Sequence, residues 1–148
     1  MPTVKAEYIN PFIDALVNAF DMMLGCHVQR ASLALRNRKA ATHEYSGVIG
    51  LSGTAVGTVV VSLSTNVARK ATSVMLMTPE DELTPEEVVD AVGELANMVA
   101  GAAKAKLEEY QLSVSLPNVV TGVGHEICFP SNVTPILVPY ESDWGPLT

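Results

Sequence analysis

The chain has 148 residues, of which 48% are hydrophobic and 17% are charged, and its net charge is −7. This length and composition predict one globular domain over residues 1–148 and argue against a disordered chain. The negative charge argues against nucleic-acid binding, because basic surfaces supply most of that affinity.

The first predicted element is a helix over residues 11–24. Asn10 and Pro11 are typical of an N-cap and a first helical position, and Gly25 is typical of the residue just past a helix end. Apolar residues recur at helical spacing between these signals: Phe12, Ile13, Leu16, Val17, Phe20, Met23 and Leu24.

The next segments are predicted to be strands. Residues 28–37 alternate in part between apolar and polar, while residues 44–51 and 55–63 are rich in β-branched side chains. The Ser52-Gly53 pair between the last two predicts a hairpin. A helix is expected over residues 64–77, where apolar residues return to helical spacing.

A second long helix is predicted from Thr84 to about Tyr110. Thr84, Pro85 and Glu87 stand at the positions of an N-cap, a first helical proline and the glutamate of a capping box. Strands are expected over residues 112–122 and 125–141, with prolines that suggest bends or edge positions.

The predicted order is helix, strands, helix, then helix and strands again. It favours an α+β fold with a mostly antiparallel sheet, long helices packed on one face, and pseudo-duplicated αβ halves.

Three features argue for a cytoplasmic protein that does not span a membrane. Lys5 and Glu7 interrupt any early apolar run, so no signal peptide is expected. The uncharged stretch 45–68 is broken by Ser, Thr and Gly, and we interpret it as the hairpin. Cys26 and Cys128 form no CxxC pair and are predicted to be buried thiols in a reducing compartment.

The start of the second long helix and the loop before it are acidic. From Ala71 to Ala103 the chain has no Lys or Arg but seven acids: Glu80, Asp81, Glu82, Glu86, Glu87, Asp90 and Glu94. This surface could simply be solvated, or it could meet a partner that carries a cation.

A helical wheel places an acid and an amide together on the outer face of this helix. With 100° per residue, a buried stripe is predicted for Val88, Val92, Leu95, Val99 and Ala102. Glu94 then lies at about 240° and Asn97 at about 180° from Val88, so they are neighbours at i and i+3 on the exposed side. Asp90, Gly93 and Gly101 are predicted to share that side.

The two glycines distinguish this face from an ordinary solvated one. A helix that needs only solubility has no use for glycine, which costs about 1 kcal/mol relative to alanine. Gly93 and Gly101 remove side chains and would let another backbone approach. We therefore interpret Asp90, Gly93 and Gly101 as a partner-docking surface around Glu94 and Asn97.

This pair could orient a reaction without supplying a nucleophile. The chain has no GxSxG motif, and its three histidines have no metal-binding spacing, so no metal site is expected. Asn cannot act as a general base, but it can hold a water, and Glu can bind a lysine. Phosphoryl hydrolysis, which depends mainly on positioning and charge, fits such a device if the partner brings the metal.

The stretch DAVGELANMVAGAAKAKL, residues 90–107, resembles the signature helix of the CheX/CheC/FliY phosphatases of bacterial chemotaxis. The resemblance extends to residues 6–25 and 46–62, which are similar to the first helix and central hairpin of the CheX branch. It also includes residues 112–131, which are similar to its later strands.

The resemblance implies hydrolysis of the phospho-aspartate of a CheY-type response regulator. Glu94 would bind the regulator's active-site lysine, and Asn97 would orient the attacking water. The chain would bind no cofactor itself, because the Mg²⁺ belongs to the regulator. Asn18 lacks a glutamate three residues before it, where Ala15 stands, so the resemblance implies one site and a CheX-type homodimer. The alternative is a non-catalytic adaptor that binds a response regulator or a flagellar partner.

Overall fold

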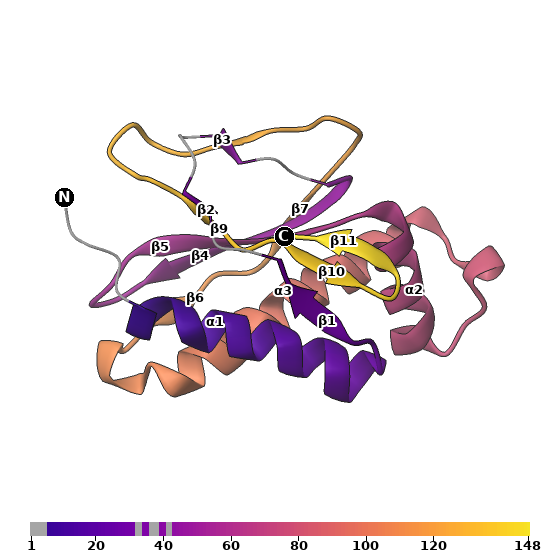
Figure 1. The fold of residues 1–148 in the computed structure, drawn as a ribbon, viewed down its shortest axis with the longest axis horizontal. Coiled ribbons are helices and arrows are strands. Elements are labelled where there is room, and N and C mark those ends of the chain that lie inside the picture. The colour runs from indigo at the N-terminus through magenta and orange to yellow at the C-terminus, as the bar shows by residue number, and fades with distance from the viewer. Residues whose placement is uncertain (1–5, 32–33, 36–38, 41–42) are drawn as a thin grey trace.

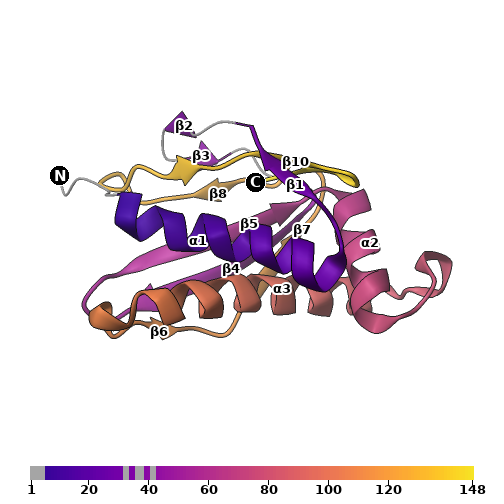
Figure 2. The same ribbon diagram turned by 60° about the horizontal axis from the view of Figure 1, so that its bottom comes forward.

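The computed structural model describes residues 6–31, 34–35, 39–40 and 43–148. Figure 1 shows α1 and α3 below a central sheet, α2 at its right-hand end, and β2, β3 and β9 above it. Figure 2 shows the same arrangement from a second side, with α1 and α3 lying next to each other along the sheet. The predicted α+β fold, with helices on one face of an antiparallel sheet, is confirmed.

The three helices occupy the regions where helices were predicted. They are α1 (Ala6–Asn18), which continues as a π-helical segment η1 (Ala19–Met23), α2 (Thr65–Leu76) and α3 (Pro85–Lys106). Two 3₁₀ turns, η2 (Glu80–Glu82) and η3 (Glu108–Tyr110), lie on either side of α3 in the chain. Among the residues that the structure describes, no helix is both long and apolar enough to span a bilayer.

The main sheet has the order β1-β10-β11-β5-β4-β6, and β7 also pairs with β4. Its strands are β1 (Val28–Arg30), β4 (Tyr45–Ser52), β5 (Gly57–Leu63), β6 (Ser113–Val114), β7 (Asn118–Thr121), β10 (Tyr140–Ser142) and β11 (Gly145–Leu147). The strand pairs above the sheet are β2 (Ala34–Leu35) with β9 (Ile136–Leu137), and β3 (Lys39–Ala40) with β8 (Ile127–Cys128).

The order of the strands confirms the pseudo-duplicated halves. The first half contributes α1, β1 and the β4–β5 hairpin, and the second contributes α3, β6 with β7, and the β10–β11 hairpin. The two hairpins meet where β11 pairs with β5. The strands that follow each long helix pair with the hairpin of the other half. Strand β1 pairs with β10, and both β6 and β7 pair with β4. Each half therefore completes the sheet of the other.

The core lies between the sheet and the helices. Strand β4 turns Gly47 and Ile49 toward α3, because alternate residues of a strand face the same side. A Cβ atom on Gly47 would lie 2.7 Å from the Cβ atom of Ala96, so glycine is what lets α3 pack closely on the sheet. Neighbouring Ser46 faces the opposite side, toward the short strand pairs.

The predicted start of the first helix is wrong. The helix already includes Ala6, and Pro11 lies inside it and is buried. Tyr8 packs edge-to-face on Tyr110, with ring centroids 5.2 Å apart, so the first turns are held by a contact with η3 that no local pattern reveals. The predicted end is confirmed, since Gly25 has a φ of +62°.

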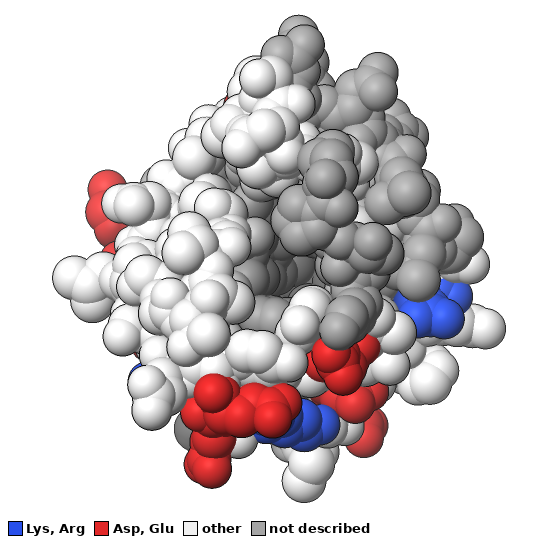
Figure 3. All heavy atoms as spheres, turned by 90° about the vertical axis from the view of Figure 1, so that its left-hand side faces the viewer, with Lys and Arg blue, Asp and Glu red and all other residues white. Residues whose placement is uncertain are grey.

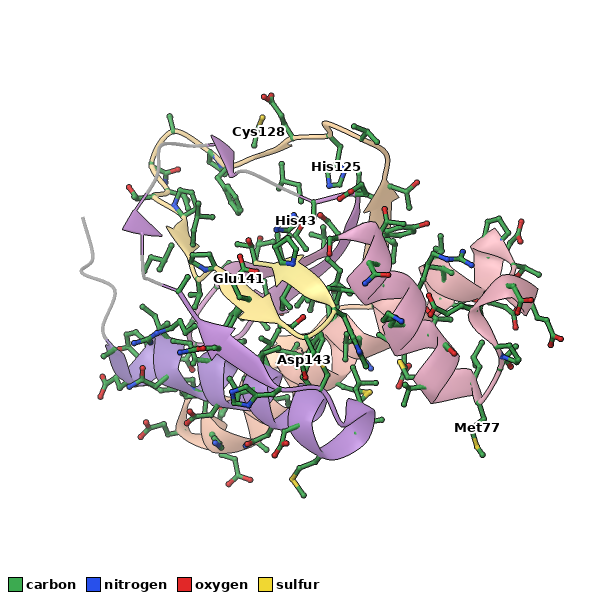
Figure 4. The ribbon with its side chains drawn as sticks, turned by 45° about the vertical axis from the view of Figure 1, so that its right-hand side comes forward. His43, Met77, His125, Cys128, Glu141 and Asp143 are labelled. Atoms are coloured by element: carbon green, nitrogen blue, oxygen red, sulfur yellow. The ribbon has the colours of Figure 1, made fainter. Side chains whose placement is uncertain are left out.

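Several predicted strands are shorter than expected. Pro117 separates β6 from β7, and the segment 125–141 contains three short strands, β8, β9 and β10. The predicted strand 28–37 falls partly outside the described residues. Cys26 is buried as predicted, whereas Cys128 is exposed on β8, far from the helices in Figure 4.

Candidate functional site

Helix α3 begins with the predicted capping box. The Glu87 backbone N–H donates to Thr84 Oγ1 at 3.2 Å, and the Thr84 N–H donates to Glu87 Oε1 at 2.9 Å. The 22 residues that follow form one uninterrupted helix that packs on α1, α2 and β4. A side chain on this helix is therefore held on a rigid support.

Glu94 and Asn97 are both exposed on the outer side of α3, as the wheel predicted. They lie one turn apart on the same face, with Asp90 one turn before Glu94 and Gly101 one turn after Asn97, both also exposed. Glu94 and Asn97 make no hydrogen bond or ion pair with another described residue. Both groups are thus available to an incoming molecule.

The predicted exposure of Gly93 is wrong. Gly93 is buried, and a Cβ atom there would lie 3.3 Å from Val119 Cγ2 and 3.5 Å from Pro117 Cγ. The glycine therefore admits residues of this chain, beside β7. Gly101 does face open space, with no atom within 4 Å of an added Cβ. Ala102, which was predicted to belong to the buried stripe, is exposed in the last turns of α3.

A groove lies beside Glu94 that sequence reasoning missed. Its walls come from α3 and from the start of β7, and its volume is about 290 Å³. We call it the α3–β7 groove, lined by Val89, Asp90, Gly93, Glu94, Pro117, Asn118 and Val119. The signal that could have indicated it is Gly93 itself, since a glycine inside a long helix marks a close approach.

The equivalent position on α1 does not repeat the acid–amide pair. Asn18 is exposed, but Ala15 is buried and has no functional group. The neighbouring acid, Asp14, forms an ion pair with Lys106 at 3.5 Å. Figure 3, which faces the end of the molecule where α1 begins and α3 ends, shows charged side chains of both signs gathered along the helical layer.

Two of the histidines form part of a polar network on the other face of the sheet. His125 Nε2 lies 2.8 Å from Ser46 Oγ, which is 2.9 Å from Ser62 Oγ, and Ser62 Oγ accepts the His43 backbone N–H at 2.7 Å. Figure 4 shows both histidines on the side away from the helices. Since Ser46 and Ser62 are buried, this network satisfies their hydroxyl groups and joins the short strands to the sheet.

Across residues 6–31, 34–35, 39–40 and 43–148, no three His, Cys, Asp or Glu side chains gather in a group that could hold a metal ion. The outer face of α3 presents a carboxylate, Glu94, and a carboxamide, Asn97, side by side. An amide can both donate to and accept from a water, and a carboxylate can accept from a cation.

Solved structures of known proteins share this fold over nearly the whole chain. The chemotaxis protein CheX from Vibrio vulnificus is 31% identical, with a TM-score of 0.85, over 96% of this chain and 95% of that one. The Borrelia burgdorferi complex of CheX with CheY, BeF₃ and Mg²⁺ contains a similar chain at 21% identity. Its TM-score is 0.77 over 97% of this chain and 94% of that one, which shows the shared fold.

Sequence comparison gives the family. The CheY-P phosphatase CheX of Thermotoga maritima is 29% identical over 121 residues, which are 80% of this chain and 78% of that protein. Residues 45–141 match the family model of the chemotaxis phosphatase CheX. This match spans more than half of the chain and includes α3, so the chain belongs to the CheX family of chemotaxis phosphatases.

Proposed function

We propose that this chain hydrolyses the phospho-aspartate of a CheY-type receiver domain, with Asn97 orienting the attacking water and Glu94 binding the receiver's lysine. The observation that carries the proposal is the exposed, unpartnered pair of Glu94 and Asn97 on one face of α3. Two relatives support it, one named as a CheY-P phosphatase and one solved in a complex with CheY.

In the proposed reaction, α3 lies across the phosphorylation site of the receiver. The carboxylate of Glu94 accepts hydrogen bonds from the lysine ammonium, which fixes the helix in place. The carboxamide of Asn97 then holds a water in line with the phosphorus–oxygen bond to the aspartate. The water oxygen bonds to phosphorus, and the phosphorus–oxygen bond to the aspartate breaks. The products are inorganic phosphate and a free aspartate.

No group of this chain removes a proton or accepts the phosphate in this scheme. Hydrolysis of a phosphoryl group gains most from positioning and from neutralising charge on its oxygens. The receiver holds the Mg²⁺ that supplies this neutralisation. The homodimer and the cytoplasmic location that the resemblance and composition indicate stay predictions.

The test is phosphate release from a CheY-type receiver of the same organism, phosphorylated with acetyl phosphate in the presence of Mg²⁺. The unmodified chain should accelerate release. Asn97→Ala should lower kcat at least about 100-fold, because the water loses its orientation, while binding is retained. Glu94→Ala should mainly raise KM, because it removes docking.

A matched control is Asn18→Ala, which removes an exposed amide from α1 and should leave both constants unchanged. Full activity of Asn97→Ala would contradict the water-positioning role. Binding of the receiver by the unmodified chain without faster phosphate release would instead favour the adaptor.

A further inference from the structure

The α3–β7 groove is lined by half-buried apolar residues and by exposed polar ones. Val89, Pro117 and Val119 are half-buried and supply the apolar lining, together with the backbone of Gly93. Asp90 and Glu94 rise from the helix side, and Asn118 is exposed on the strand side. Any side chain at position 93 would lie 3.3–3.5 Å from Val119 and Pro117, so glycine lets these two residues pack directly on the backbone of α3.

The negative charge of the groove is unbalanced within the chain. Asp90, like Glu94, makes no hydrogen bond or ion pair with another described residue. Two acids of the same acidic stretch are engaged, since Glu80 forms an ion pair with Lys70 at 3.0 Å and Glu87 caps α3, whereas Glu86, like Asp90, makes no such contact with a described residue. With no Lys or Arg from Ala71 to Ala103, the sequence around the groove offers no cation of its own.

We propose that the α3–β7 groove takes a second basic side chain of the phosphorylated receiver, a lysine or arginine outside its phosphorylation site. The aliphatic stem would pack on Pro117 and Val119, and the charged end would be bound by Asp90, with the Asn118 amide oxygen accepting a further hydrogen bond. Long basic side chains cover apolar surface in this way while keeping their charge in water.

Shape and charge together favour this occupant. The groove, at about 290 Å³, is at or below the size of most small-molecule pockets, and it is continuous with the face that carries Glu94. Two carboxylates of its lining would repel a phosphoryl group or a nucleic acid. A lysine or arginine matches both the charge and the apolar side chains of Val89, Pro117 and Val119.

This inference rests on the proposed function and adds a source of specificity to it. The lysine that Glu94 would bind belongs to the receiver's phosphorylation site and cannot distinguish one receiver from another. Asp90 lies one turn, about 5.4 Å, further along the helix and would meet receiver surface outside that site. A contact at this distance can select among receivers.

The experiment measures KM and kcat for phosphate release from the phosphorylated receiver, and receiver binding by titration calorimetry. Asp90→Asn removes one charge from the groove, and Glu86→Gln removes one from an exposed position of α3 outside it. We expect Asp90→Asn to raise KM about tenfold with kcat unchanged, and Glu86→Gln to change KM less than about twofold. Gly93→Ala, which adds a methyl group to the groove lining, should raise KM like Asp90→Asn.

Asp90 is exposed, so its substitution does not disturb packing, and circular dichroism checks that Gly93→Ala is folded. The inference is overturned if KM for Asp90→Asn stays within twofold of that for Glu86→Gln while Asn97→Ala still abolishes activity. If the unmodified chain does not accelerate phosphate release, the proposed function fails, and the calorimetric comparison of Asp90→Asn with Glu86→Gln then decides the groove alone. Absence of any receiver binding would overturn both.

Discussion

Substituting Gly47 with alanine should displace the helix that carries the candidate site. The added Cβ atom would lie 2.7 Å from the Cβ atom of Ala96 and 3.3 Å from the Val92 carbonyl oxygen. Carbon atoms pack best at about 3.5–4.0 Å, so β4 and α3 must separate by about 1 Å. Neither contact atom is the end of a flexible side chain, so the backbone itself has to move.

The magnitude follows from two opposing effects. Overpacking of a core typically costs about 1–3 kcal/mol, while replacing glycine in a strand returns about 0.5 kcal/mol of backbone entropy. We therefore expect Gly47→Ala to lower the free energy of unfolding by about 1–2 kcal/mol. The shift falls on Ala96, next to Asn97, and a misplacement of about 1 Å can lower kcat up to about 100-fold.

Urea unfolding and phosphate release measure the two effects on the same protein. Gly50→Ala is the matched control, since an added Cβ atom on the same strand would meet Ser115 Oγ at an ordinary 3.5 Å. The double substitution Gly47→Ala with Ala96→Gly moves the methyl group from the helix to the strand and should recover part of both losses. With Ala96→Gly alone, which costs about 1 kcal/mol, it completes a double-mutant cycle.

A favourable coupling of about 1 kcal/mol or more between the two positions is expected in that cycle. The reasoning is refuted if Gly47→Ala unfolds at the same urea concentration as the unmodified chain, or if the effects of the two substitutions simply add.

Three further predictions concern the ends and surface of α3 and a buried tyrosine. Thr84→Ala breaks the capping box with Glu87 and should lower the free energy of unfolding by about 1 kcal/mol in urea titrations. Gly101→Ala, at an open helical position, should raise the free energy of unfolding by about 0.5–1 kcal/mol, seen as a higher melting temperature. If receivers dock there, the substitution should also raise KM. Burial raises the pKa of Tyr140 to about 12, with Arg30 acting in the lowering direction and the Asp14 carboxylate adding a smaller raising effect. The folded state therefore favours the neutral phenol. The contribution of this group to the free energy of unfolding should be complete below pH 10 and should be lost from about pH 10 to 12. The difference in urea unfolding between the unmodified chain and Tyr140→Phe, measured across this range, would show the loss.

The long helix of the site could be predicted from sequence because its signals are local. The capping box at Thr84 and Glu87 and the helical spacing of the apolar residues depend only on neighbours within a few positions. The same periodicity placed Glu94 and Asn97 on the outside correctly. A helical wheel assumes one narrow buried stripe, however, and α3 is buried on a wider side, by the sheet and by the other helices, so the wheel misplaced Gly93. The wheel also cannot show where along the helix the covering elements end, so it misplaced Ala102.

The features that sequence reasoning missed depend on contacts between distant segments. The early start of α1 reflects the packing of Tyr8 on Tyr110, about a hundred residues away in the chain. The α3–β7 groove exists because residues 117–119 return to the side of α3, which no local pattern specifies. The roles of Glu94 and Asn97 are predicted from the chemistry of an acid and an amide together with the family resemblance.

The two-fold pattern of the sheet allows the outer faces of α1 and α3 to be compared position by position. It places α1 and α3 in equivalent positions. When Asn18 is aligned with Asn97, Ala15 corresponds to Glu94 and Asp14 corresponds to Gly93. Ala15 is buried, and the Asp14 carboxylate forms an ion pair with Lys106 where α3 has a bare glycine. The face of α1 thus lacks both the acid and the glycine that α3 has at the corresponding positions. If the outer face of α3 is the docking surface, each chain should bind one receiver, and calorimetry that gave two receivers per chain would show that α1 also takes part.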